Sequence, residues 1–133
     1  MPRIFADSGA LIMTARGEPQ LRDAALSWLE DPDHVLLTSP FVYLETVPKA
    51  AFHRRDLELE FYRTYFNHAE WLRETSNVVD EAVGISTRSG VGPMDSLHVA
   101  AATLMQADLL VTAEKPGKSI YNAEAVPVVY LTT

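Results

Sequence analysis

Short apolar runs alternate along the chain with longer segments in which apolar residues recur at helical spacing. Most of these runs are continuously apolar, which is typical of parallel strands buried on both faces of a sheet. We therefore predict strands over residues 3–6, 34–39, 107–114 and 127–131, and a further candidate strand over 70–75.

The longer segments predict helices, because their apolar residues return every three or four positions. These segments are 9–15, 19–31, 40–55, 56–69, 76–90 and 90–104. Leu57, Phe61 and Tyr65 recur at the four-residue spacing of a helix in the fourth of these segments, and Pro48 is expected to kink the third. Strands that alternate with helices indicate an α/β fold, in which helices cover both faces of a parallel sheet.

The helix over 90–104 carries one residue that its apolar pattern does not explain. Pro93 is favoured at a first helical position, so Gly92 is the expected N-cap and Asp95 falls in the first turn. A carboxylate there can accept unpaired backbone N–H groups and suits the positive end of the helix dipole. Taken alone, Asp95 is interpreted as a helix-start residue.

Composition narrows the class of protein. A length of 133 residues predicts a single domain over 1–133, and the lack of cysteine excludes disulfides and cysteine-ligated zinc. No run of 18 apolar residues occurs and the N-terminus lacks the features of a signal peptide, so we expect no membrane span and a cytoplasmic protein. The net charge of −7 does not favour bulk electrostatic binding of nucleic acid.

Four carboxylates are expected to converge at one edge of the predicted sheet. Asp7 ends the first strand, Glu114 ends the 107–114 strand, and Asp95 begins the helix that leads into that strand. Glu45 lies in the helix after the second strand and shares a face with Phe41. Ligands of such sheets bind at the carboxyl ends of the strands. Because clustered carboxylates repel one another, a Mg²⁺-like cation would stabilise them and could activate water for phosphodiester hydrolysis.

Four short motifs carry a resemblance to a known family. They are "FADSGALI", "FVYLETV", "GPMDSLHVAAATL" and "LLVTAE", in this order along the chain. Together they resemble the PIN-domain nucleases, and most closely the toxin subunits of VapBC toxin–antitoxin systems. The resemblance covers essentially the whole chain.

The resemblance implies a three-layer α/β/α sandwich around a mainly parallel sheet of four to five strands. It also implies Mg²⁺ or Mn²⁺ as cofactor, endonucleolytic cleavage of RNA, a cognate antitoxin as partner, and a homodimer. It assigns the metal-site carboxylates to Asp7, Glu45 and Asp95, and supporting hydroxyls to Ser8 and Thr112.

Glu114 is a departure from the family, which often has Asp at this position. We expect Glu114 to act as a fourth catalytic carboxylate that reaches the metal through water. The loop that follows it, "EKPGKSIYN", is also less typical of the family than an Asp followed closely by an aromatic residue.

Three further groups have two interpretations each. His98 follows Asp95 by three positions and is expected to be a packed helix histidine rather than a ligand. The basic stretch of Lys49, Arg54 and Arg55 is a candidate contact for RNA phosphates or a solvated helix face. An aromatic series is expected in the core or at an interface; its members are Phe52, Phe61, Tyr62, Tyr65 and Phe66.

Other functions fit the sequence less well. The main alternative is a catalytically weak or inactive PIN-like module that binds RNA or a protein partner. Aspartyl-phosphate chemistry would need a second Asp where the chain has Gly9. A metal-independent ribonuclease built on Arg63 and His68 does not suit the α/β pattern.

Overall fold

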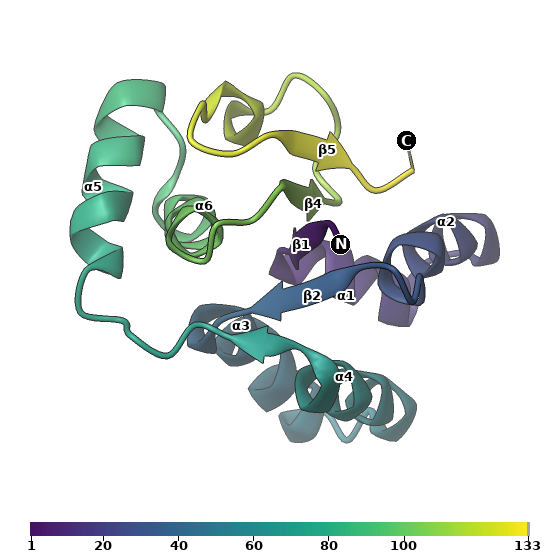
Figure 1. Cartoon of the computed structure of the whole chain (residues 1–133). Coiled ribbons are helices and arrows are strands. Elements are labelled where there is room, and N and C mark those ends of the chain that lie inside the picture. Colours follow the sequence, from purple (N-terminus) through teal and green to yellow (C-terminus); the bar gives the residue numbers. More distant parts are fainter. Residues whose placement is uncertain (133) are drawn as a thin grey trace.

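The computed structural model describes residues 1–132, and within them five strands form one parallel sheet (Figure 1). The order across the sheet is β3-β2-β1-β4-β5, and every neighbouring pair is parallel. The strands are β1 (Arg3–Ala6), β2 (Val35–Thr38), β3 (Glu70–Trp71), β4 (Leu109–Thr112) and β5 (Val128–Tyr130). β1 is the central strand, and its residues Ile4, Phe5 and Ala6 are completely buried.

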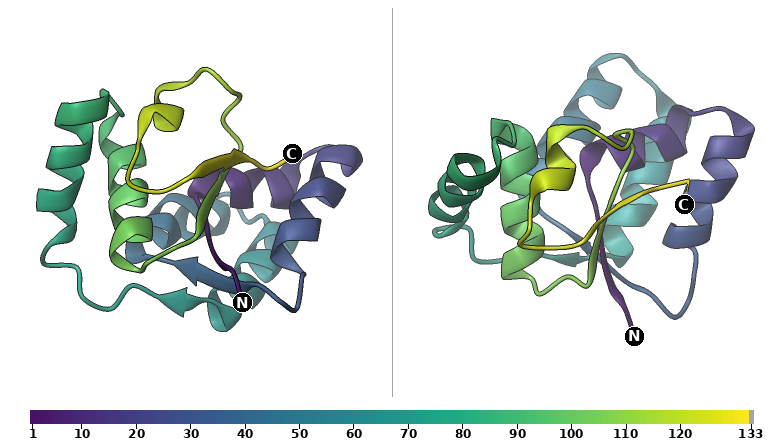
Figure 2. Two further views of the ribbon diagram at one scale, coloured as in Figure 1. Left: turned by 45° about the horizontal axis from the view of Figure 1, so that its top comes forward. Right: turned by 90° about the horizontal axis from the view of Figure 1, so that it is seen from above.

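Helices cover both faces of this sheet. They are α1 (Ser8–Arg16), α2 (Pro19–Leu29), α3 (Pro40–Phe52), α4 (Asp56–His68), α5 (Val78–Ser89) and α6 (Pro93–Leu104). Crossovers between parallel strands are right-handed, so the two steps from β1 to β2 to β3 put α1 to α4 on one face. The step from β3 back to β4 runs in the opposite direction and puts α5 and α6 on the other face, where they lie together in all three views (Figures 1 and 2). The predicted three-layer α/β/α fold is therefore confirmed.

The elements occur in the predicted order, with shorter strands and one addition. The candidate strand over 70–75 is reduced to Glu70–Trp71, and α3 ends at Phe52 rather than at residue 55. A single 3₁₀ turn, Ser119–Asn122, lies in the segment that we expected to be a loop. α3 continues through Pro48. No helix within residues 1–132 is long and apolar enough to cross a membrane.

The apolar residues of α4 are not all buried. Leu57 is 84% exposed, whereas Leu59 is 6% exposed and Tyr62 is fully buried. This aromatic-rich helix carries two overlapping apolar stripes, and contact with the sheet selects between them. The Tyr65 hydroxyl donates a hydrogen bond to the Leu37 carbonyl of β2, which fixes the rotation of the helix.

Two leucines of α4 test this assignment. Leu59→Ala should lower the free energy of unfolding by about 2–5 kcal/mol, because it leaves a cavity in the core. Leu57→Ala should change it by less than about 0.5 kcal/mol, because that side chain lies in solvent. Urea unfolding of both variants measures the difference, and equal effects would contradict the packing described above.

Candidate active site

β1 has β2 on one side and β4 on the other, so the strand order reverses between β1 and β4. α1 leaves the carboxyl end of β1 for one face, while the helices that precede β4 cover the other face. In parallel α/β folds, the crevice at such a reversal is the usual position of a ligand site. Asp7 follows β1 directly and Thr112 ends β4, so both lie at this crevice.

Asp7 is buried and caps the start of α1. It is 3% exposed, and as the N-cap of α1 it accepts a hydrogen bond from the Ala10 amide on Oδ1 at 2.8 Å. Its own amide donates to the Val111 carbonyl of β4. Burial raises the pKa of Asp7 to about 6, although hydrogen bonds from Thr112 and Ala10 oppose that rise and the charge of Asp95 adds to it. Asp7 is therefore a helix cap and also a poorly solvated carboxylate.

Asp95 lies in the first turn of α6, with Pro93 at the helix start and Gly92 as N-cap, as predicted. Burial raises the pKa of Asp95; His98 opposes that rise, while the charges of Glu114 and Glu45 contribute to it. No hydrogen bond from residues 1–132 contributes to the pKa of this carboxylate. Its position in the first turn still suits the positive end of the helix dipole, as expected.

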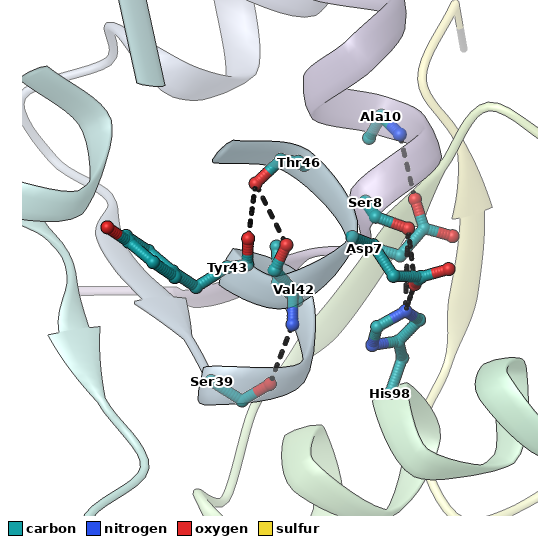
Figure 3. A network of polar contacts seen from close by, with 9 residues as sticks. Asp7, Ser8, Ala10, Ser39, Val42, Tyr43, Thr46 and His98 are labelled. Atoms are coloured by element: carbon teal, nitrogen blue, oxygen red, sulfur yellow. Dashed lines mark hydrogen bonds and ion pairs between the residues drawn. The ribbon is translucent and has the colours of Figure 1, made fainter. Parts of the chain in front are cut away.

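Glu45 is held by two side chains from other helices. The Ser8 hydroxyl donates to Glu45 Oε1 at 2.8 Å, and His98 Nε2 lies 2.5 Å from the same oxygen. Ser8 and His98 also approach each other, with Oγ and Nε2 3.5 Å apart (Figure 3). The hydrogen bond from His98 is the largest cause that lowers the pKa of Glu45, and the bond from Ser8 adds to it against the opposing effect of burial.

His98 is packed in the core and also lies beside the site. It is 1% exposed, which agrees with a packed helix histidine, but it also contacts Glu45. Its spacing of three residues after Asp95 was the sequence signal for a place beside the site. The contact with Glu45 itself joins residues 53 positions apart and has no local signature.

Glu114 differs from the other three carboxylates because it is exposed. Its amide donates to the Thr112 hydroxyl at 3.1 Å, and its carbonyl accepts a hydrogen bond from the Tyr121 hydroxyl at 2.5 Å. Burial is the largest cause that raises the pKa of Tyr121, and the charges of Asp7 and Glu114 raise it further. Tyr121 is therefore a residue beside the site that sequence reasoning missed, and its signal was an aromatic side chain in a polar loop.

The expected carboxylate cluster is not a closed metal site. Among residues 1–132, no group of three or more His, Asp or Glu side chains is arranged to hold a metal ion. Glu45 Oε1 is engaged by Ser8 and His98, and Glu114 lies in an exposed turn.

The donor chemistry nevertheless fits a hard divalent cation. The charge of Asp95 raises the pKa of Asp7, and the charges of Glu114 and Glu45 raise the pKa of Asp95. Burial raises both pKa values as well. A cation with a preference for oxygen ligands would offset both effects. Whether Asp7, Glu45, Asp95 and Glu114 bind metal stays a prediction.

The basic stretch begins one turn beyond the site. Lys49 follows Glu45 by four residues on α3, so both lie on the same side of that helix. Arg54 and Arg55 lie past the end of α3, in the turn that leads to α4. Arg54 is exposed and adopts a positive φ of 55°.

A family model described as the PIN domain matches residues 4–116, so the chain belongs to the PIN-domain family. A search of curated proteins finds no significant match to the sequence.

Solved structures show the same fold at low sequence identity. One is a chain of VapBC2 from Rickettsia felis, in a crystal structure with a DNA fragment from the VapBC2 promoter. It superposes with a TM-score of 0.74 at 12% identity, and the match covers 96% of this chain and 98% of that one. A toxin–antitoxin complex from Klebsiella pneumoniae gives 0.71 at 16% identity, with 96% and 97% covered. VapBC-1 from nontypeable Haemophilus influenzae gives 0.68 at 18% identity, with 98% and 99% covered.

The raised pKa of Asp7 predicts how stability depends on pH. Its ordinary value is 3.8 and its value in the folded protein is about 6, so between these values the folded state holds a proton that the unfolded state has lost. In metal-free buffer, the free energy of unfolding should therefore fall as the pH rises through this window. Asp7→Asn keeps a good N-cap and should reduce this fall, stabilising the protein at pH 7 by up to about 3 kcal/mol.

Urea unfolding from pH 4 to pH 8 measures this dependence. Asp23→Asn, in an exposed part of α2, is the matched control and should retain the wild-type profile. An Asp7→Asn variant with the wild-type pH profile would show that Asp7 is not the group responsible.

Proposed function

We propose that the chain is a divalent-metal-dependent endoribonuclease of the VapC toxin type. Membership of the PIN-domain family and the shared fold with VapBC chains support a nuclease. The observation that carries the proposal is the pair Asp7 and Asp95, a buried and a half-buried carboxylate at the crevice between β1 and β4, both with raised pKa values. Carboxylates whose charged forms are disfavoured by burial and by one another are stabilised if a cation binds at this crevice.

Asp7 and Asp95 would hold Mg²⁺ or Mn²⁺, with Glu45 contributing the oxygen that Ser8 and His98 leave unengaged. A bound ion of this kind supplies positive charge towards a phosphate and activates water for hydrolysis. Glu114 would contribute through water, since Mg²⁺ keeps several waters when it binds to proteins.

The supporting residues hold these carboxylates in place. Thr112 is buried and its hydrogen bond favours the charged form of Asp7. Ser8 donates to Glu45. Lys49, Arg54 and Arg55 provide local positive charge for RNA phosphates on a chain whose net charge is −7.

The proposal includes protein partners. The similar structures are described as VapBC or toxin–antitoxin complexes, which supports a cognate antitoxin that silences the nuclease in the cytoplasm. A homodimer is also proposed. Exposed apolar side chains on α5, such as Val79 and Val83, supply surface that such contacts could cover.

A PIN-like module that binds RNA or protein without cutting is the second candidate. Two observations favour it: Glu114 is exposed, and the carboxylates within residues 1–132 do not form a closed ligand set. Activity separates the two candidates.

The decisive variant is Asp95→Asn, which is close in shape to the original residue but lacks its charge. Loss of residues that only support metal ligands costs about 10- to 100-fold, so loss of a ligand should lower the rate of RNA cleavage at least about 100-fold. Asp80→Asn is the matched control, because Asp80 occupies the first turn of the neighbouring helix α5 and is exposed. Its rate should equal that of the wild type.

The assay uses purified protein, a mixture of structured RNAs, and Mg²⁺ or Mn²⁺ with and without EDTA. The proposal requires that EDTA and Asp95→Asn each abolish cleavage. Cleavage that survives EDTA would contradict the metal site, and a wild-type protein that cuts nothing with either metal would support the binding module.

A further inference from the structure

His98 is an unusual residue for its position on α6. The helix positions that follow it, Val99 to Ala102, are apolar or small and fully buried. Among the side chains of residues 1–132, the buried atoms without a hydrogen-bond partner are His98 Nδ1 and Thr38 Oγ1. A leucine at position 98 would avoid the free-energy cost of burying an unpaired ring nitrogen. Packing alone therefore does not explain the imidazole.

The unpaired nitrogen indicates which ring nitrogen carries the proton. A proton on Nδ1 would be a buried donor without an acceptor, whereas a proton on Nε2 points at Glu45 Oε1. A proton on Nε2 is satisfied by Glu45 Oε1, and a bare Nδ1 leaves only an unused acceptor. His98 is then a hydrogen-bond donor towards the site.

The same oxygen of Glu45 receives both donors. Ser8 from the start of α1 and His98 from the second turn of α6 converge on Oε1, and neither reaches Oε2. Two donors from two different helices fix the orientation of a carboxylate that sits on a third helix, α3. Hydrogen bonds of this kind commonly orient a metal-binding carboxylate, and their removal weakens metal binding about 10- to 100-fold.

From this geometry we infer that His98 is a positioning residue. Together with Ser8 it clamps Oε1 of Glu45 and leaves Oε2 as the oxygen that would be free to bind a divalent cation. The inference rests on the proposed metal-dependent function, and it adds a role for a histidine that makes no contact with metal or RNA. In this arrangement, His98 acts through the hydrogen bond from Nε2 and not through the volume that its ring fills.

A matched pair of variants separates these two roles. Glutamine places its amide nitrogen near the position of Nε2, whereas asparagine places its amide near Nδ1 and cannot reach Glu45. Both variants replace the ring with a buried polar amide, and thermal unfolding of each checks that it is folded at the temperature of the binding measurement. The affinity for Mn²⁺, measured by titration calorimetry, should stay within about threefold of wild type in His98→Gln and weaken about tenfold or more in His98→Asn.

A second measurement uses the metal-free wild-type protein. The ¹⁵N chemical shifts of the His98 ring at pH 7 should show a proton on Nε2. This result does not depend on whether either variant folds. A proton on Nδ1 with a bare Nε2 would overturn the inference.

The remaining outcomes are also decisive. The inference is wrong if His98→Asn binds Mn²⁺ as tightly as the wild type, or if His98→Gln binds it as weakly as His98→Asn. A wild-type protein that binds no Mn²⁺ would overturn both the inference and the proposed metal-dependent function. A wild-type protein that binds Mn²⁺ through this clamp but cuts no RNA would overturn the proposed function alone.

Discussion

Burial of the Asp7 carboxylate at the carboxyl end of β1 is the constraint on which the rest of the site depends. β1 is the middle strand and pairs with β2 on one side and β4 on the other. Asp7 directly follows this strand, where helices cover both faces of the sheet. The same carboxylate caps α1, and the Ala10 amide therefore fixes its position. Asp7 can neither swing into solvent nor give up its place without loss of the helix start.

This constraint sets two requirements against each other. Burial favours the protonated form of Asp7, while binding of a cation requires the charged form. Thr112 and the Ala10 amide favour the charged form, but Asp95 opposes it. A metal-free protein therefore carries a cost in stability at neutral pH, which is common at functional sites. The clamp on Glu45 has the opposite character, because hydrogen bonds lower the pKa of that carboxylate and keep it charged.

Much of this arrangement follows from local sequence. Continuous apolar runs located β1, β2, β4 and β5, and Pro93 after Gly92 located the start of α6. Since parallel strands share a carboxyl edge, these elements alone put Asp7, Thr112 and Asp95 near one another.

Other features depend on tertiary contacts and have no local signature. The rotation of α4 is set by the bond from Tyr65 to β2. Tyr121 reaches the site only because the loop after β4 folds back so that its hydroxyl meets the Glu114 carbonyl. The contact of His98 with Glu45 requires the relative position of α3 and α6.

The most direct measurement is a crystal structure of the wild-type protein soaked with Mn²⁺, with the anomalous signal used to locate the ion. An anomalous peak between the carboxylates of Asp7 and Asp95, at coordination distance from both, is the expected result. A peak at another place on the molecule, or none at a saturating concentration of Mn²⁺, would contradict a metal site at the crevice between β1 and β4.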